Sequence, residues 1–174
     1  MTAHPHFGNL TSLGDATPFV DRLREIIDRI KLFEDFDEGE IEIMAGYMSC
    51  YHAPSGTEII REAAAGDFMI LIIEGTVEIT KFDSEGLPAT IGMAGPGKTL
   101  GEMSLIDGEP RFASCLAVVD TLFAVLDREG LTRIIAEEPR IGVKLLMELL
   151  MLLNQRLRNV STAYVKLIGG KKRY

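Results

Sequence analysis

Between residues 48 and 126 short apolar runs alternate with turn residues, and this pattern restricts the fold more than any other feature. The runs are CYHA, EIIR, FMILII, TVEITKF and ATIGM, with two more near 111–118 and 121–126. In TVEITKF, Val77 and Ile79 alternate with polar residues at the period of a half-buried strand. Turns of Gly, Pro, Ser and Asp separate the runs every ~8–12 residues. The pattern predicts a mainly β fold, an antiparallel jelly-roll barrel (double-stranded β-helix).

Helices are expected before the barrel. Thr17 followed by Pro18 predicts a capped helix start, and apolar residues at helical spacing continue to about Phe33. Asp37 and Glu40 have the spacing of a capping box before a second helix.

Helices are also expected after the barrel. Asp127 predicts the cap of a short helix, and Pro139 predicts the start of a long one that runs to about Leu167. Apolar residues along the long helix recur at spacings of four and three, which is a heptad seam. The seam consists of Leu146, Leu150, Leu153, Leu157, Val160, Tyr164 and Leu167. Too little protein remains to cover its far half, so the seam predicts a homodimer through this helix.

The chain has 174 residues, which is the length of one domain with extra helix. The expected parts are a flexible N-terminus (1–16), N-terminal helices (17–47), the barrel (48–126), C-terminal helices (127–168) and a tail (169–174).

Composition excludes several classes of function. The net charge of −8 argues against nucleic-acid binding, and the one basic cluster, Lys171 to Arg173, lies in the expected tail. LLMELLMLL is interrupted by Glu148, so no membrane span is expected, and no secretion signal is visible. We therefore expect a cytoplasmic protein. Cys50 and Cys115 match no disulfide framework or zinc motif and are expected to be buried.

The segment TLGEMSLIDGEPRFASCLA, residues 99–117, contains several groups that suit a ligand site. Gly101 permits a sharp turn, and the first amides of the short helix expected at 102–107 would attract an anion. Arg111 offers a fork for two phosphate oxygens, and Glu102 offers an acceptor for a sugar hydroxyl. Together they describe a site for a phosphorylated ribose. Alternatively, Glu102 and Arg111 simply form a loop salt bridge.

GEMSLIDGEPRFAS closely resembles the phosphate-binding cassette of the cyclic nucleotide-binding domain family. That family includes bacterial catabolite-activator-type regulators, regulatory subunits of cAMP-dependent protein kinase, and cyclic-nucleotide-gated channels. Gly56, Gly66-Asp67 and the segment ILIIEGTVEI are also similar to the family's turn positions. The resemblance covers roughly residues 35 to 165 and implies the same barrel.

The resemblance implies roles for the cassette residues. Arg111 would bind the exocyclic oxygens of the cyclic phosphate, and Glu102 would accept a hydrogen bond from the ribose 2′-hydroxyl. Backbone N–H groups would complete the phosphate cradle, at Met103, Ser104 and near Ala113.

The resemblance also implies how the base is held. Ile79 and Ile91 would line the base pocket, Gly101 would allow close approach, and Ser114 stands where the family has Ser or Thr. Phe112 departs from the pattern, because the family has a small residue there, or a Thr or Ser that helps cGMP-preferring members hold guanine. Phenylalanine cannot donate that hydrogen bond, so cAMP is favoured over cGMP. Its ring could narrow the pocket or stack on the base.

In this family the helix after the barrel usually caps the base, often from a partner subunit. The candidates on this chain are Arg158, Asn159, Ser161 and Thr162.

The expected function is a homodimeric cAMP-binding sensor without a cofactor or enzymatic activity, which signals to a downstream partner by repacking its C-terminal helices. The winged helix-turn-helix of the family's gene regulators does not follow before Tyr174. A ligand-less scaffold that keeps the barrel is the alternative. An enzyme is the third possibility, since jelly-roll dioxygenases and isomerases bind a metal through several histidines and a carboxylate. Only His52 falls in the strand region, while His4 and His6 lie near the start, so no metal site is expected.

Overall fold

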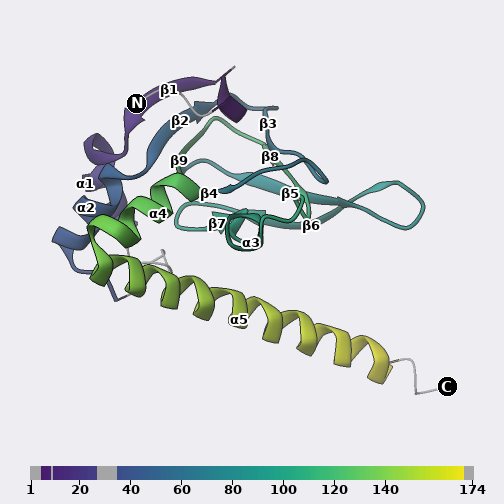
Figure 1. Ribbon diagram of the computed structural model, residues 1–174. Helices are drawn as coiled ribbons and strands as arrows, with labels where there is room; N and C mark the ends of the chain where they lie inside the picture. Colours follow the sequence, from purple (N-terminus) through teal and green to yellow (C-terminus); the bar gives the residue numbers. More distant parts are fainter. Residues whose placement is uncertain (1–4, 9, 27–34, 171–174) are drawn as a thin grey trace.

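The computed structural model describes residues 5–8, 10–26 and 35–170, which form a β-barrel flanked by helices (Figure 1). The strands are β1 (Thr11–Asp15), β2 (Ser49–Ala53), β3 (Glu58–Ile60), β4 (Phe68–Glu74), β5 (Val77–Phe82), β6 (Pro88–Ala94), β7 (Thr99–Leu100), β8 (Ser114–Ala117) and β9 (Thr121–Asp127). Within the described part they make two antiparallel sheets, ordered β1-β2-β9-β4-β7 and β3-β8-β5-β6. The predicted jelly-roll architecture is confirmed.

The helical elements lie before, within and after the barrel. They are η1 (Pro5–Phe7), η2 (Thr17–Phe19), α1 (Val20–Glu25), α2 (Glu38–Gly46), α3 (Glu102–Asp107), α4 (Arg128–Glu137) and α5 (Pro139–Gly170). The predicted capping box is present, with Asp37 and Glu40 each accepting from the other's backbone N–H. The Asp127 carboxylate caps α4 by accepting from the Gly130 N–H at 2.7 Å.

The N-terminal segment differs from the flexible start expected for residues 1–16. Strand β1 pairs with β2, and the Phe7 side chain is 1% exposed inside the barrel. The few apolar residues of this segment, Phe7, Leu10 and Leu13, show no helical or strand periodicity, so the sequence did not predict the burial of Phe7. Thr17 does not cap a helix; its N–H donates to Asp15 Oδ1 at 2.9 Å instead. Helix α1 ends at Glu25, and the helix expected over 27–33 lies outside the described residues.

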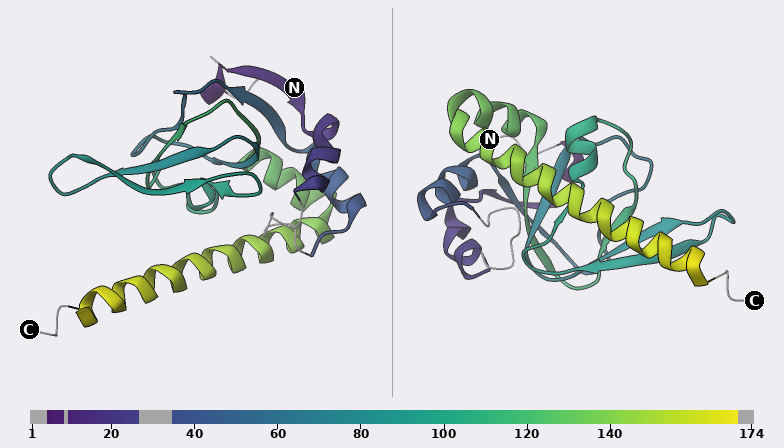
Figure 2. Two further views of the ribbon diagram at one scale, coloured as in Figure 1. Left: turned by 180° about the vertical axis from the view of Figure 1, so that it is seen from behind. Right: turned by 90° about the horizontal axis from the view of Figure 1, so that it is seen from below.

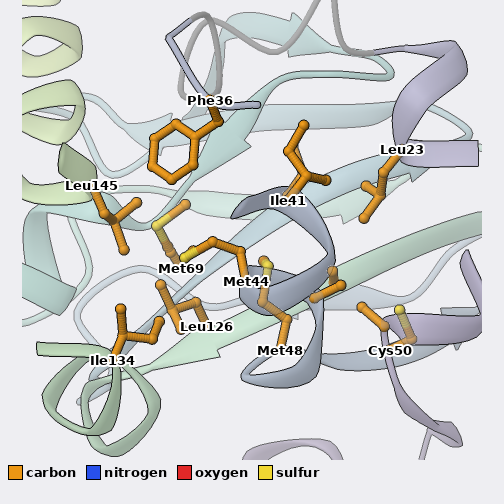
Figure 3. Packing of buried hydrophobic residues seen from close by; sticks show 14 of the residues in the cluster. Leu23, Phe36, Ile41, Met44, Met48, Cys50, Met69, Leu126, Ile134 and Leu145 are labelled. Atoms are coloured by element: carbon orange, nitrogen blue, oxygen red, sulfur yellow. The ribbon is translucent and has the colours of Figure 1, made fainter. Parts of the chain in front are cut away.

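Buried apolar residues form two clusters on opposite faces of the five-stranded sheet. Figure 3 shows the first, where α2 and α4 pack on the sheet through residues such as Met44, Met69 and Ile134. The second fills the barrel and contains the rings of Phe7, Tyr51, Phe68 and Phe123.

The two cysteines are buried, as predicted. Cys50 belongs to the first cluster and Cys115 to the second. Burial raises the pKa of each thiol to about 12. Both therefore stay protonated and unreactive at neutral pH.

Helix α5 has two different apolar faces. Ile141, Leu145 and Leu149 are buried against the first cluster. The predicted seam is a separate stripe, and its members Leu157, Val160 and Tyr164 are each more than 60% exposed. Figure 2 shows this far end of α5 projecting past the barrel, on the same side as the β5–β6 hairpin. No helix in the described ranges is long and apolar enough to cross a membrane.

Helices α4 and α5 cross closely at Gly142. A methyl group there would lie 2.8 Å from Ile135 Cα and 3.0 Å from Ile135 Cγ1. Glycine is a poor helix former, with a deficit of ~1 kcal/mol relative to alanine. Its presence inside α5 is therefore explained by the close approach of the two backbones.

We predict that Gly142→Ala lowers the free energy of unfolding by about 1–3 kcal/mol, because overpacking at the crossing outweighs the gain in helix propensity. Urea titration followed by circular dichroism measures this change. Gly46→Ala is the matched control, since a methyl group at this helical position meets nothing within 4 Å. Stability that is unchanged or higher in Gly142→Ala would contradict the close crossing.

Candidate functional site

The cassette turns sharply between β7 and α3. Gly101 has φ 87°, a conformation that glycine adopts readily, and a methyl group there would lie 2.7 Å from Arg111 Nη1. The other end of α3 is held by α4, because Arg128 Nη2 donates to the carbonyls of Ser104 and Leu105 at 3.2 and 2.9 Å. The cassette helix is thus fixed at both ends, at its start by glycine and at its end by an arginine.

Arg111, which follows α3 in the cassette, is only 3% exposed. Its Nη1 donates to the carbonyls of Phe68 at 2.7 Å and Gly101 at 3.1 Å. Its Cζ lies 4.0 Å from the centroid of the Phe68 ring, a cation–π contact. Burial lowers the pKa of the Arg111 guanidinium, which nevertheless stays charged at neutral pH.

Two nitrogen atoms of Arg111 have no hydrogen-bond partner among the described residues. Its Nε and Nη2 are buried and make no hydrogen bond to any residue in the described ranges. These N–H groups share one edge of the guanidinium, where two oxygens of one anion can accept both. A buried donor without an acceptor is costly, at ~1–3 kcal/mol and more for a charged group. This edge of Arg111 is therefore suited to an anionic ligand.

The loop before β4 leaves space for that guanidinium. A methyl group at Gly66 would lie 2.4 Å from Arg111 Nε and 2.5 Å from Nη2. Backbone hydrogen bonds join the loop to the cassette, from Ala63 N to Arg111 O at 2.8 Å and from Arg111 N to Ala64 O at 2.9 Å. Ala63 is held with φ 61°, which is unusual for a residue with a side chain.

Glu102 is 1% exposed and pairs with the long helix, not with Arg111. Its Oε2 accepts from Arg156 Nη1 at 3.0 Å, and Arg156 Nη2 donates to the Thr99 carbonyl at 2.7 Å. The other oxygen, Oε1, is buried and accepts no hydrogen bond from the described part of the chain. The loop salt bridge between Glu102 and Arg111 is therefore absent from the described structure, and Glu102 keeps a free acceptor.

The remaining predicted residues differ in their exposure. Ser104 is buried in α3, Met103 and Ile91 are exposed, and Ile79 and Ala113 are half-buried.

Ser114, the last residue of the cassette, bonds to β3 and to the loop that follows it. Its Oγ accepts from the Glu62 N–H at 2.9 Å and donates to Glu58 Oε1 at 3.2 Å. It lines a surface groove of about 370 Å³ together with Glu58, Arg61, Glu62, Thr80, Phe82 and Leu116.

Phe112 does not fill the barrel. Its ring is 54% exposed, and the Lys81 Nζ lies 4.2 Å from the ring centroid. The same Nζ donates to the Phe112 carbonyl at 2.7 Å, so one lysine fixes both the backbone and the ring.

The four predicted base-cap residues, Arg158, Asn159, Ser161 and Thr162, are exposed on α5. Asn159 lines a groove of about 160 Å³ between α5 and the β6–β7 turn, together with Gly97, Lys98, Thr99, Leu152, Gln155 and Arg156. Sequence analysis missed Arg156, the residue of α5 that ion-pairs with the cassette. No spacing rule distinguishes it from its polar neighbours, and only the fold brings it to Glu102.

Two of the three histidines considered as metal ligands lie within the described residues, and each has its own partners. His52 lies 3.9 Å from Asp120, His6 packs on Phe7 and Phe68, and His4 lies outside the described residues. Among the residues that are described, no group of three or more His, Cys, Asp or Glu could hold a metal ion.

An ion pair between Glu62 and Lys81 connects the loop after β3 to β5. Glu62 Oε1 accepts from Lys81 Nζ at 2.8 Å, and Oε2 accepts from the Phe82 N–H at 2.9 Å. The hydrogen bond from Lys81, followed by that from Phe82, holds the pKa of Glu62 below its ordinary value of 4.5. The charged form of Glu62 therefore stabilises the fold beside the cassette.

We predict that wild-type protein loses stability more steeply than Glu62→Gln as the pH falls. Because the folded-state pKa of Glu62 is lowered, its contribution is complete above pH 4.5 and is lost as the pH falls through the folded value. Urea unfolding at a series of pH values from 6 down to about 3 measures the difference. In a Lys81→Met background the same substitution should change the slope much less; equal effects in both backgrounds would refute the Glu62–Lys81 coupling.

The similarity to known proteins extends over the barrel and includes the cassette. A family model for the cyclic nucleotide-binding domain matches residues 51–138. A CRP-like cAMP-activated global transcriptional regulator of Mycobacterium tuberculosis is 28% identical over 144 residues, covering 83% of this chain. The chain spans 62% of that regulator's length.

Solved structures agree with the sequence comparison. A cyclic nucleotide-binding domain from Methylobacillus flagellatus KT is 38% identical with a TM-score of 0.83, covering 94% of this chain and 92% of that one. Thermus thermophilus Catabolite Activator Protein is 30% identical with a TM-score of 0.73, covering 79% of this chain and 62% of that one. The chain belongs to the cyclic nucleotide-binding domain family.

Proposed function

We propose that this protein is a sensor that binds cAMP at the cassette and signals through α5. The observation that carries the proposal is the set of unmatched buried atoms, Nε and Nη2 of Arg111 and Oε1 of Glu102. Two donors for an anion and one acceptor for a hydroxyl, ten residues or fewer apart in the chain, fit a cyclic phosphate joined to a ribose.

The cyclic phosphate would occupy the free edge of Arg111. Its exocyclic oxygens would accept from Nε and Nη2, which supplies the partners that those buried groups need. Backbone N–H groups of Met103 and Ser104 at the start of α3, and one near Ala113, would complete the cradle. The glycines at 66 and 101 support this geometry, because side chains at either position would displace the guanidinium.

The ribose 2′-hydroxyl would donate to the free Oε1 of Glu102. The other oxygen of this carboxylate is bonded to Arg156 on α5. A ligand hydroxyl at Glu102 therefore changes the hydrogen bonding of the carboxylate that holds Arg156, the arginine that links α5 to the cassette in the described part of the chain. This is the physical route by which we propose that nucleotide binding shifts the packing of the long helix.

The purine would lie between Ile79 and Ile91, with Phe112 near the phosphate end. Phe112 has no hydroxyl for the guanine amino group, so we propose cAMP over cGMP as the ligand. Its exposed ring, held by Lys81, is available to stack on a base. A cap would come from the exposed polar residues of α5, Arg158, Asn159, Ser161 or Thr162, on this chain or a partner.

The exposed seam of α5 supports a homodimer. Its apolar side chains from Leu146 to Leu167 repeat at heptad spacing and lie on a different face from the residues that pack on the sheet. A second copy of the same helix would cover them. In this proposal the dimer transmits the repacking of α5 to a downstream partner.

We predict that calorimetry detects cAMP binding with a micromolar or lower dissociation constant, tighter than for cGMP. Arg111→Leu should weaken it roughly a hundredfold, because the charge-assisted fork is lost. Arg22→Leu is the matched control, since Arg22 is an exposed arginine paired with Glu74 and lies outside the cassette. If neither nucleotide binds the wild-type protein, the ligand-less scaffold replaces the sensor.

We further predict that cAMP changes the dimer dissociation constant about fivefold or more, and that Arg156→Met reduces this ratio towards one while nucleotide still binds. Analytical ultracentrifugation with and without cAMP measures the ratio. Arg140→Met, which removes an exposed arginine from the same helix without touching Glu102, should keep the wild-type ratio. An undiminished ratio in Arg156→Met would exclude the Glu102–Arg156 contact as the coupling element.

A further inference from the structure

The N-terminal residues His6 and Phe7 lie against Phe68 in the barrel. The Phe7 ring centroid is 4.8 Å from that of Phe68, at an interplanar angle of 63°. The His6 ring centroid is 5.0 Å from Phe68 and 5.1 Å from Phe7. Two rings from the start of the chain therefore pack on one residue of β4.

Phe68 is also the residue on which Arg111 rests. Its ring lies under the guanidinium and its carbonyl accepts from Nη1 at 2.7 Å. A shift of Phe68 would therefore move the guanidinium, whose free edge lies on the other side of the fork from Nη1. Contacts that fix the Phe68 ring consequently fix the direction of Arg111.

We propose that His6 and Phe7 are positioning residues for the nucleotide site, acting on Arg111 through Phe68. This inference rests on the proposed function for its effect on binding. A guanidinium that is already oriented loses less freedom when the ligand arrives, so its hold on the phosphate is tighter. The N-terminal segment is thus part of the binding apparatus although it is distant from the cassette in sequence.

The contacts that anchor the N-terminal segment allow its effect on Arg111 to be tested separately from folding. It is anchored by the Phe7 ring, by a hydrogen bond from His6 Nε2 to the Ile59 carbonyl at 3.3 Å, and by β1 at the edge of its sheet. Phe68 itself belongs to β4, which lies between β9 and β7. Trimming His6 or Phe7 should therefore leave Phe68 in the sheet but remove contacts that orient its ring.

Calorimetric titration of Phe7→Ala with cAMP tests the proposal. We expect about tenfold weaker binding, with a smaller loss in His6→Ala, and recovery of most of the affinity in Phe7→Leu. Ile134→Ala is the matched control, because Ile134 is equally buried but lies in the other cluster. It should lose stability and keep its affinity. Equal loss of affinity in Phe7→Ala and Ile134→Ala, at a temperature where both are folded, would overturn the proposal.

A second measurement needs no nucleotide. The Arg111 Nε–H resonance of the free protein, assigned by its loss in Arg111→Leu, should shift or broaden in Phe7→Ala and His6→Ala but not in Ile134→Ala. His6 is exposed, so His6→Ala keeps the test available if Phe7→Ala does not fold. If the wild-type protein binds no nucleotide, the proposed function is wrong. This resonance still tests whether His6 and Phe7 position Arg111. An unchanged resonance in both variants would overturn it.

Discussion

The buried guanidinium of Arg111 is the constraint around which the site is arranged. A charged group at 3% exposure needs compensation, and only part of it comes from the two carbonyls and the aromatic ring that contact it. The space that it occupies excludes side chains at Gly66 and Gly101. The barrel therefore holds a cation with one edge that no described residue satisfies, an arrangement that costs stability and suits a site that binds a ligand.

In the described part of the chain, two arginines of the C-terminal helices form hydrogen bonds with the cassette. Arg128 of α4 binds the carbonyl end of α3, and Arg156 of α5 binds Glu102 at its start. Both arginines act on the same short helix, so α3 cannot move without altering one or both of these contacts. Since α4 and α5 pack closely at Gly142, the cassette and the helices behave as connected parts of one structure.

Sequence analysis predicted the features that depend on residues close together in the chain and missed those that depend on distant residues. Asp37 and Asp127 each cap a helix by accepting from a backbone N–H three residues away. Strands with regular alternation were identified because that alternation is visible between adjacent residues. The cassette was identified because residues 101–114 are continuous in the chain and resemble the family's motif, whereas their chemistry alone left a loop salt bridge as the alternative. Arg156 was missed because its partners Glu102 and Thr99 are 54 and 57 residues away. Phe7 was missed because its burial depends on rings from three different strands.

Because α5 is long, a small change in its angle would displace its far end by a large distance. From Gly142 to Leu167 it extends for about 38 Å, at ~1.5 Å per residue. With its near end fixed at the crossing with α4, a tilt of ~5° would displace the far end by roughly 3 Å, which is more than half the pitch of one helical turn. A change of angle at the glycine crossing would therefore be amplified along α5, so that a small shift near the barrel would correspond to a much larger one at the exposed end of the helix.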